Sequence, residues 1–533
     1  MGRNHGPRTR ERSPIIAIFR SCCWGFMLQF RPIDDEYCGS VCSCVHRGRR
    51  TTRGFMKSGN TERMLRWVCL IGFGWVVGVT VGGTQQATST IESYRATAEK
   101  IIQETMKGND SFKKLEGLCD DIGHRLSGSA QLEQAVVWAV ETMKRDGQEN
   151  VRAEPVMVPH WVRGQESLAM VKPRAQPLVL LGLGGSIGTP AEGINAEVLV
   201  VRDEAELESL GDRVKGKIVL FNNPMPEYTV EKGTQYGTSV RFRSKGASLV
   251  AEKGGLACLV RSVTASSLRS PHTGALRYLE DKPKVPAAAI TLEDAEMISR
   301  FQARGVPVGV TLKMEAKTLE PAKSANVVGE LRGSQWPDEV VVISGHLDSW
   351  DIGQGAHDDG GGCVQAMEAI NVLRRLNLRP KRTIRVVLWT NEENGLAGAK
   401  QYAIDHEAEL VKHVAAIESD GGSFRPKEYS VECRDEARQA VALEQMKSIL
   451  DLVSSIGTMT VEADGSGADV GQMKPAGVVL MGHNVEASKY FDYHHSPADT
   501  IDKVDPKELS QNVAVMATVA FVLADMPKRV GEK

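Results

Sequence analysis

The sequence has almost no excess charge of either sign. Its 65 Lys and Arg residues are matched by 67 Asp and Glu residues, which leaves a formal net charge of −2 over 533 residues. A nucleic-acid partner bound through bulk positive charge is therefore not expected, because such binding depends on an excess of Lys and Arg. The chain is also too long for a single hydrophobic core. Any specific function must therefore reside in a local site.

Cysteine is scarce where a disulfide framework would be needed. After residue 85 the sequence contains four cysteines, and their spacing matches no such framework. Near the N-terminus Cys38, Cys42 and Cys44 lie close together, but no second pair follows at ligand spacing, so zinc binding is not predicted there. A large domain can be stable without disulfides. The four later cysteines are Cys119, Cys258, Cys363 and Cys433.

The N-terminal region resembles a targeting segment rather than part of a fold. Residues 67–81 form an apolar run with basic residues before it and small residues after it, which is typical of a secretory signal peptide. Since such a signal stands at the start of a protein, we expect translation to begin at Met56 or Met64. Residues 1–55 are then a non-native extension and residues 56–85 the signal peptide. Cleavage predicts a secreted or periplasmic protein without a membrane segment; an uncleaved signal anchor is the alternative.

The remaining chain follows an α/β pattern that one region interrupts. In residues 86–160 and 324–533, buried-strand patterns such as Val340 to Ile343 alternate with helical periods. This alternation predicts a mostly parallel central sheet flanked by helices. Between these parts, in residues 161–323, short strand-like runs alternate with turns. We therefore predict an α/β domain with an inserted β-rich domain.

Polar side chains follow three of the predicted strands, at the point where each strand ends. The segment 340–363 carries His346, Asp348, Asp358 and Asp359 in a Gly-rich loop directly after a strand. Glu392 and Glu393 follow the next strand along the chain, and Asp420 follows the third. Because ligands bind outside the carboxyl ends of strands in open α/β sheets, we expect these side chains to converge on one edge.

The residue types at this edge indicate metal chemistry. Imidazole and carboxylate groups without thiolate are typical of a hydrolytic site for zinc or another borderline divalent ion. One carboxylate can bridge two ions. Glu392 and Glu393 are neighbours and point in different directions, so one can bind metal while the other acts as general base. The alternative is that this pair stabilises a helix N-terminus. The residues alone do not choose between His494 and His495 as a further ligand.

Five motifs together resemble the co-catalytic di-zinc exopeptidases of the aminopeptidase and glutamate carboxypeptidase superfamily. They occupy residues 346–348, 355–360, 391–395, 418–420 and 494–500. A narrower resemblance, to one family within this group, extends from about Ile91 to the C-terminal helix and includes the inserted region. It rests on residues 159–161, 270–274, 344–351, 353–356 and 379–383.

The resemblance implies a set of metal ligands. It makes His346 and Asp420 ligands of one or other zinc ion, Asp358 the bridge between the ions, and Glu393 and His495 the remaining ligands. The family places its last ligand directly before a Ser or Thr, which favours His495. Two Zn²⁺ ions per chain and a homodimer are implied in the same way.

The resemblance also implies roles beside the ligands. Glu392 is expected to be the general base. Asp348 is expected to orient His346 through the second ring nitrogen, as outer-shell partners of metal-bound histidines do. His357 stands where the family leads us to expect an apolar residue, and it lies beside the metals.

These expectations define a secreted di-zinc metallo-exopeptidase that hydrolyses short peptides as a carboxypeptidase or dipeptidase. The alternative is an aminopeptidase with the same hydrolytic centre, because the motifs do not say which peptide terminus is read. A zinc-dependent cyclase, or a binding protein that keeps the fold without the chemistry, is more remote. Loss of a ligand or of the base would indicate such a binding protein, and every one of these residues is present.

Overall fold

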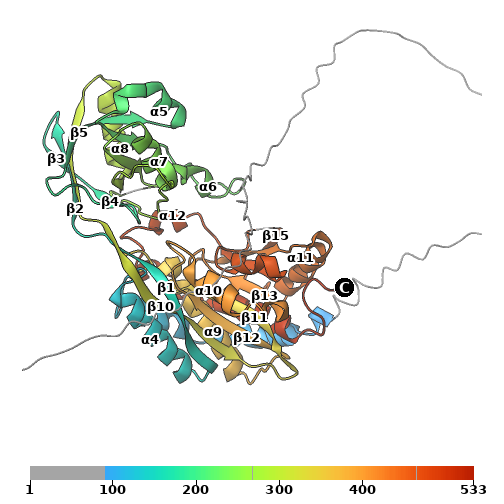
Figure 1. The fold of residues 1–533 in the computed structure, drawn as a ribbon. Coiled ribbons are helices and arrows are strands. Elements are labelled where there is room, and N and C mark those ends of the chain that lie inside the picture. The colour runs from blue at the N-terminus through green and yellow to red at the C-terminus, as the bar shows by residue number, and fades with distance from the viewer. Residues whose placement is uncertain (1–89, 267, 464) are drawn as a thin grey trace, which may run out of the picture. The chain divides into compact units, whose positions relative to one another are not determined.

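The computed structural model describes residues 90–533, with the exception of residues 267 and 464. The extension and the signal peptide predicted for residues 1–85 lie outside the described residues. The described chain contains two eight-stranded sheets with helices packed on them (Figure 1). Within it, no helix is both long enough and apolar enough to cross a membrane.

The first sheet has parallel strands at its centre. The four neighbouring strands β12, β11, β13 and β16 are all parallel, whereas the strands at one side are antiparallel and β14 runs against β16. This confirms the predicted α/β fold with a mostly parallel centre. In sheet order the strands are β1 (Glu149–Val162), β10 (Lys317–Leu331), β12 (Arg382–Trp389), β11 (Trp336–His346), β13 (His413–Glu418), β16 (Val479–Val485), β14 (Pro426–Glu432) and β15 (Thr460–Ala463).

Helices cover both faces of the first sheet, which explains why its central strands are apolar throughout. Every residue of β12 and β13 is buried, as expected for parallel strands between two helical layers. One face packs on α9 and α13 through residues such as Met367 and Val515, and the other packs on α10 through Tyr402. The helices are α2 (Arg95–Thr105), α3 (Asp110–Cys119), α4 (Ala130–Arg145), α9 (Gly361–Arg375), α10 (Ala397–Asp405), α11 (Glu436–Asp451), α12 (Tyr490–Tyr493) and α13 (Pro506–Asp525).

The caps of these helices lie where the sequence has capping residues. Asp505 precedes Pro506 and accepts hydrogen bonds from the backbone N–H groups of Lys507 and Glu508, so α13 starts where Pro is tolerated and a carboxylate satisfies free donors. Ser129 caps α4 in the same manner. Short turns of helix complete the chain: η1 (Gly211–Val214), η2 (Ala356–Gly360), η3 (Leu410–Lys412), η4 (Val470–Ala476) and η5 (Ile501–Lys503).

The second sheet is formed by the region between β1 and β10. Its strands include those predicted from the sequence, and β5, β6, β7 and β8 run parallel. Helices accompany them, because α7 and α8 bury residues such as Val250 and Ile298 against the sheet. In sheet order the strands are β3 (Gln176–Leu178), β2 (Glu166–Lys172), β9 (Val308–Met314), β5 (Ile194–Val201), β6 (Ile218–Phe221), β7 (Ala257–Arg261), β8 (Ala287–Ile290) and β4 (Leu180–Gly182). The helices are α5 (Glu204–Leu210), α6 (Tyr236–Ser239), α7 (Arg241–Glu252) and α8 (Leu292–Ala303).

The order of the first sheet determines where its loops meet. Strand β11 lies between β12 and β13, with His346 opposite Trp389 and Ser344 opposite Glu418. The three strands are parallel and in register at their carboxyl ends, so the loops that follow them leave from the same edge.

Candidate metal centre

Four of the predicted ligands come from segments at this edge. His346 is the last residue of β11, Glu393 lies just past β12, Asp420 just past β13, and Asp358 lies in η2, directly before α9. The fifth, His495, follows the short helix α12. All five side chains are brought together, and the donor atoms fall into overlapping groups that could hold metal ions.

The carboxylate of Asp358 faces two pairs of side chains. Its Oδ1 is 3.1 Å from Nε2 of His346, and that nitrogen is 3.3 Å from Oδ1 of Asp420. Its Oδ2 is 3.2 Å from Nε2 of His495, and that nitrogen is 3.0 Å from Oε2 of Glu393. One carboxylate therefore has a separate oxygen for each pair.

The donor set fits divalent metal ions. The cluster combines imidazole nitrogens with carboxylate oxygens, and the thiol of Cys363 donates instead to the backbone oxygen of His346. Oε1 of Glu393 and Oδ2 of Asp358 are buried and have no hydrogen-bond partner in the described part of the chain. Burial and the charge of Asp358 raise the pKa of Glu393 to about 7. Buried carboxylates crowded in this way require positive charge nearby, which bound cations would provide.

His494 lies close to the cluster but farther from its centre than His495. Its Nε2 is 3.7 Å from Oδ2 of Asp358, against 3.2 Å for His495. The ring of His494 stacks on that of His495, with 3.5 Å between the ring centroids. Burial and the neighbouring His495 hold the pKa of His494 well below its usual value.

Glu392 faces the same cavity as the proposed ligands. A cavity of about 890 Å³ is lined by Glu392 together with Asp358, Glu393, Asp420 and His495. Burial raises the pKa of Glu392 well above its usual range, and the charges of Asp420 and Glu393 add to this effect. A carboxylate with a raised pKa beside a metal-type cluster is suited to accept and return a proton.

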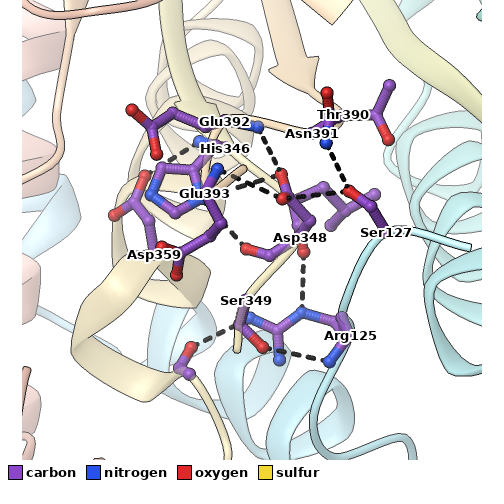
Figure 2. Close-up of polar contacts among 12 residues, drawn as sticks. Arg125, Ser127, His346, Asp348, Ser349, Asp359, Thr390, Asn391, Glu392 and Glu393 are labelled. Carbon is purple, nitrogen blue, oxygen red and sulfur yellow. Dashed lines mark hydrogen bonds and ion pairs between the residues drawn. The ribbon is translucent and has the colours of Figure 1, made fainter. Parts of the chain in front are cut away.

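Asp348 contacts His346 through its backbone rather than its carboxylate. Nδ1 of His346 is 3.0 Å from the backbone oxygen of Asp348 and 3.9 Å from Oδ1. The carboxylate accepts hydrogen bonds from the backbone N–H groups of Glu392, at 3.0 Å, and Glu393, at 3.4 Å (Figure 2). It also accepts one from the hydroxyl of Ser127 at 3.4 Å. Asp348 therefore contacts three of the residues to which a role is assigned.

Arg125 is a buried residue whose role the sequence did not reveal. Its guanidinium donates to the backbone oxygens of Leu347, Gln354 and Gly355, at 2.8, 2.6 and 2.9 Å, and to that of Gly123 at 2.8 Å. Figure 2 shows it beneath the loop that carries Asp348. One buried cation thus holds the loop between β11 and η2 in place. Its position between glycines was a weak signal, because three of its four backbone partners lie more than two hundred residues away.

Asp499 holds the backbone that carries Asp358. Its two carboxylate oxygens accept hydrogen bonds from the N–H groups of His357, at 2.8 Å, and Asp358, at 3.1 Å. The motif at residues 494–500 therefore contributes a positioning carboxylate as well as the histidines. Asp499 could not be singled out from residue types and spacing alone.

His357 is packed as an aromatic side chain. Its ring stacks on Phe424, with centroids 4.3 Å apart, and lies parallel to Tyr493. Its Nδ1 accepts a hydrogen bond from the backbone N–H of Ser423 at 3.1 Å. Burial lowers the pKa of His357 to about 4, so the ring is neutral near pH 7. It therefore fills the place of the expected apolar residue without adding charge.

The region between β1 and β10 also reaches the cluster. Thr273 donates its backbone N–H to the backbone oxygen of His495 at 2.9 Å, and the Thr273 oxygen lies 3.3 Å from Nδ1 of His495. Nδ1 of His272 lies 2.6 Å from the backbone oxygen of His494. The two histidines that follow α12 are therefore held by a loop of the second sheet's region. Arg243 also contacts His495, with Nη1 lying 3.4 Å from Nδ1 of His495, and its side chain lines the cavity.

The sequence and the fold match known peptidases. The model of peptidase family M28 matches residues 326–520. Carboxypeptidase Q from Bos taurus is 44% identical over 445 residues, which cover 83% of this chain and 92% of the relative. Carboxypeptidase Q from Homo sapiens is 42% identical and covers 84% of this chain and 93% of the relative.

The fold of this chain is also similar to that of solved peptidase structures. The crystal structure of a peptidase M28 precursor from Shewanella amazonensis superposes with a TM-score of 0.78 at 36% identity, covering 83% of this chain and 98% of that one. A zinc aminopeptidase from Bacillus subtilis has a TM-score of 0.57 at 19% identity, covering 79% and 96%, and shares the fold.

The fold and the grouped imidazole and carboxylate donors define a zinc metallopeptidase, an enzyme that hydrolyses peptides, and this agrees with the class predicted from the sequence. The chain belongs to the carboxypeptidase Q family, within peptidase family M28. The narrower resemblance noted in the motifs, which was to carboxypeptidase Q, is thereby confirmed, as is the metallo-exopeptidase prediction.

Proposed function

We propose that the protein is a secreted di-zinc exopeptidase that hydrolyses short peptides as a carboxypeptidase or dipeptidase. The observation that carries this proposal is the position of Asp358, whose two oxygens face the pair His346 and Asp420 and the pair Glu393 and His495. Each pair with one oxygen of Asp358 would hold one zinc ion. When bound, the ions polarise the scissile carbonyl and lower the pKa of water.

Glu392 is the proposed general base. Its carboxylate takes a proton from the attacking water and passes it to the nitrogen of the leaving amine, so one residue serves both halves of the reaction. Its backbone is fixed to the carboxylate of Asp348, which supports a defined position for the side chain. Asp348 is thus a positioning residue for both the base and His346.

The proposed substrates are short because the cavity is small. Its volume of about 890 Å³ lies within the range of pockets for small ligands, roughly 300–1,000 Å³. Side chains of α6 and α7, such as Tyr236 and Arg243, form part of its lining. An extended chain would require an open groove.

We also propose a domain division, which follows from the strand and turn pattern, a location, which follows from the signal-like segment, and an oligomeric state, which follows from the family resemblance. Residues 86–160 and 324–533 would form the zinc peptidase domain, residues 161–323 the inserted domain, and two chains a homodimer outside the cytosol. Light scattering of the purified protein tests the dimer, and N-terminal sequencing of the exported protein tests the signal cleavage. A monomer, or an exported chain that still begins before residue 85, would refute the corresponding part.

Dipeptides with free and blocked termini test the proposed reaction. We expect rapid hydrolysis when the carboxyl terminus is free and slow hydrolysis of the same dipeptide as its C-terminal amide. Treatment with a chelator should abolish the activity, and added Zn²⁺ should restore it. Equal hydrolysis of acid and amide, with loss of activity when the amino terminus is acetylated, would instead identify an aminopeptidase. Product masses without added water would identify a cyclase.

A further inference from the structure

Arg243 is a buried cation that has no anionic partner in the described part of the chain. It lies in the first turn of α7, is 9% exposed, and lines the cavity that holds the proposed metal ligands. Among the residues that the structure describes, its Nε has no hydrogen-bond partner. Residues 90–533, leaving out 267 and 464, provide no carboxylate within 4.0 Å of its guanidinium. Buried guanidinium groups are normally paired, so this one calls for a partner.

The contact with His495 does not satisfy the guanidinium of Arg243. Its Nη1 is 3.4 Å from Nδ1 of His495, which also lies 3.3 Å from the backbone oxygen of Thr273. When Nδ1 donates its hydrogen to that oxygen, as it must if Nε2 binds metal, the guanidinium and the ring present two donors to each other. Arg243 also hydrogen-bonds to the side chain of Tyr236, and its remaining hydrogen-bonding capacity is left for a group that enters the cavity.

The surroundings hold the guanidinium in place. It lies over the ring of Tyr236, with 5.4 Å between Cζ and the ring centroid. On another side, a Cβ atom at Gly274 would lie 2.5 Å from both Cζ and Nη1 of Arg243. Gly274 also has a φ of +137°, a conformation that other residues rarely adopt. The glycine thus makes the space that the guanidinium occupies.

We propose that Arg243 binds the free α-carboxylate of the substrate's C-terminal residue. The proposal deepens and rests on the proposed function, in which the peptide bond before that residue is cleaved. One residue spans about 3.5 Å, so the terminal carboxylate must be bound next to the metal cluster. Only the imidazole of His495 separates Arg243 from Glu393 and Asp358. The planar fork of a guanidinium matches a carboxylate with two parallel hydrogen bonds.

The charges of the cavity are divided in a way that suits this orientation. The acidic side chains all lie on the peptidase side, together with the exposed Lys400, whereas the charged side chains of the second sheet's region are Arg243, Lys245 and Arg277. Lys245 and Arg277 are exposed and serve to attract anionic substrates. Arg243 is the buried member of this group, so it is the one expected to discriminate between a carboxylate and an amide.

Steady-state kinetics with matched substrates test this assignment. The substrates are a dipeptide with free carboxyl-terminal alanine, its C-terminal amide, and a dipeptide amide that ends in glutamate, which offers a carboxylate only on its side chain. Parent, Arg243→Lys and Arg243→Met enzymes are compared after their zinc content and melting temperature have been measured. Arg241→Met is the matched control, because Arg241 lies on the same helix, is exposed and pairs with Glu204.

We expect Arg243→Met to lower kcat/KM for the free acid about 30- to 1,000-fold, mainly through KM, as for loss of a buried charge pair. The kcat/KM for the alanine amide should change less than about 3-fold, so the ratio of kcat/KM for the acid to that for the amide falls sharply. Arg243→Lys should retain part of the preference, and Arg241→Met all of it. Gly274→Ala, which leaves the charge but displaces the guanidinium, should also reduce the ratio.

The other possible results show whether the carboxypeptidase proposal or only the assignment of Arg243 fails. If the parent enzyme hydrolyses acid and amide equally, the carboxypeptidase proposal itself fails. If the parent prefers the acid but Arg243→Met loses the same factor on both substrates, or loses nothing, only the role of Arg243 is refuted. Rapid, Arg243-dependent hydrolysis of the glutamate amide would show that the guanidinium reads a side-chain carboxylate and would overturn the assignment to the terminus.

Discussion

Asp348 accepts a hydrogen bond from the backbone N–H of Glu392 at 3.0 Å, which fixes the loop after β12 to the loop after β11. The same carboxylate accepts the N–H of Glu393, and the backbone oxygen of Asp348 faces Nδ1 of His346. The proposed base and two proposed ligands thus share one positioning residue. The carboxylate of Asp348 accepts hydrogen bonds from the backbone of Glu392 and Glu393, and its backbone oxygen contacts the side chain of His346.

Substitution of Asp348 should damage catalysis through position rather than through chemistry. Asp348→Ala leaves two buried N–H groups without an acceptor, at a cost of about 1–3 kcal/mol for each. We therefore expect a lower melting temperature and a lower kcat, with KM changed less. Asp348→Asn keeps one acceptor oxygen and should fall between the alanine variant and the parent. Equal kcat and melting temperature in Asp348→Ala and parent would refute this role.

Glu392→Gln should remove most of the turnover without removing metal. The amide cannot accept the proton, so kcat is expected to fall about 10²- to 10⁴-fold, the usual contribution of general acid–base catalysis. Zinc content and folding should remain those of the parent, because Glu392 is not among the proposed ligands. The exposed Glu407→Gln is a control for the change of charge. Near-parent turnover by Glu392→Gln would assign the base to another residue.

Arg125 should be essential for the stability of the loop between β11 and η2. Its replacement by Met leaves the backbone oxygens of Leu347, Gln354 and Gly355 without their donor. Hydrogen bonds to charged groups contribute about 1.5–3 kcal/mol each. We expect a lower melting temperature and faster amide hydrogen exchange in residues 347–355. The exposed Arg300→Met should change neither quantity, and unchanged exchange in Arg125→Met would contradict the prediction.

His406 should make part of the stability depend on pH. Burial by itself lowers its pKa, but Glu154 at 3.1 Å and Glu409 at 3.2 Å raise it above the usual value. A raised pKa in the folded state means that protonation stabilises the fold. This contribution is complete below the unfolded pKa of about 6.5 and is lost as the pH rises through the folded pKa.

The comparison of His406→Gln with the parent measures that contribution. The two carboxylates have lowered pKa values and remain ionised at mildly acidic pH. The difference in melting temperature between parent and variant should therefore be larger near about pH 5.5 than near about pH 9. A difference that stays constant or grows with pH would show that the histidine is not stabilised as a cation.

The location of the candidate site at one edge of the sheet could be predicted from the sequence, because each polar cluster follows a buried strand. His346, Glu393 and Asp420 come directly after three apolar runs, and parallel strands bring such positions together. The fold class followed from the same alternation. The helices α7 and α8 were not predicted, because Gly246 and nearby serines interrupt the apolar pattern of the first.

Contacts between distant segments could not be predicted. Arg125 meets Leu347 across 222 residues, and Arg243 meets His495 across 252 residues. No local period indicates such pairs: the first depends on how the loop between α3 and α4 packs on the loop after β11, and the second on how the second sheet's region packs on the loop after α12. Likewise, the backbone oxygen of Asp348 as the partner of His346 is a matter of local geometry that residue types do not determine.

The most direct test of the central claim is the zinc content of purified parent, Glu392→Gln and Asp358→Ala proteins, measured after equilibration with zinc and removal of the excess. If Asp358 bridges two ions, the parent and Glu392→Gln should each retain two zinc ions per chain, while Asp358→Ala should retain one at most and lose activity. Two zinc ions retained by Asp358→Ala, or fewer than two in the parent, would contradict the account.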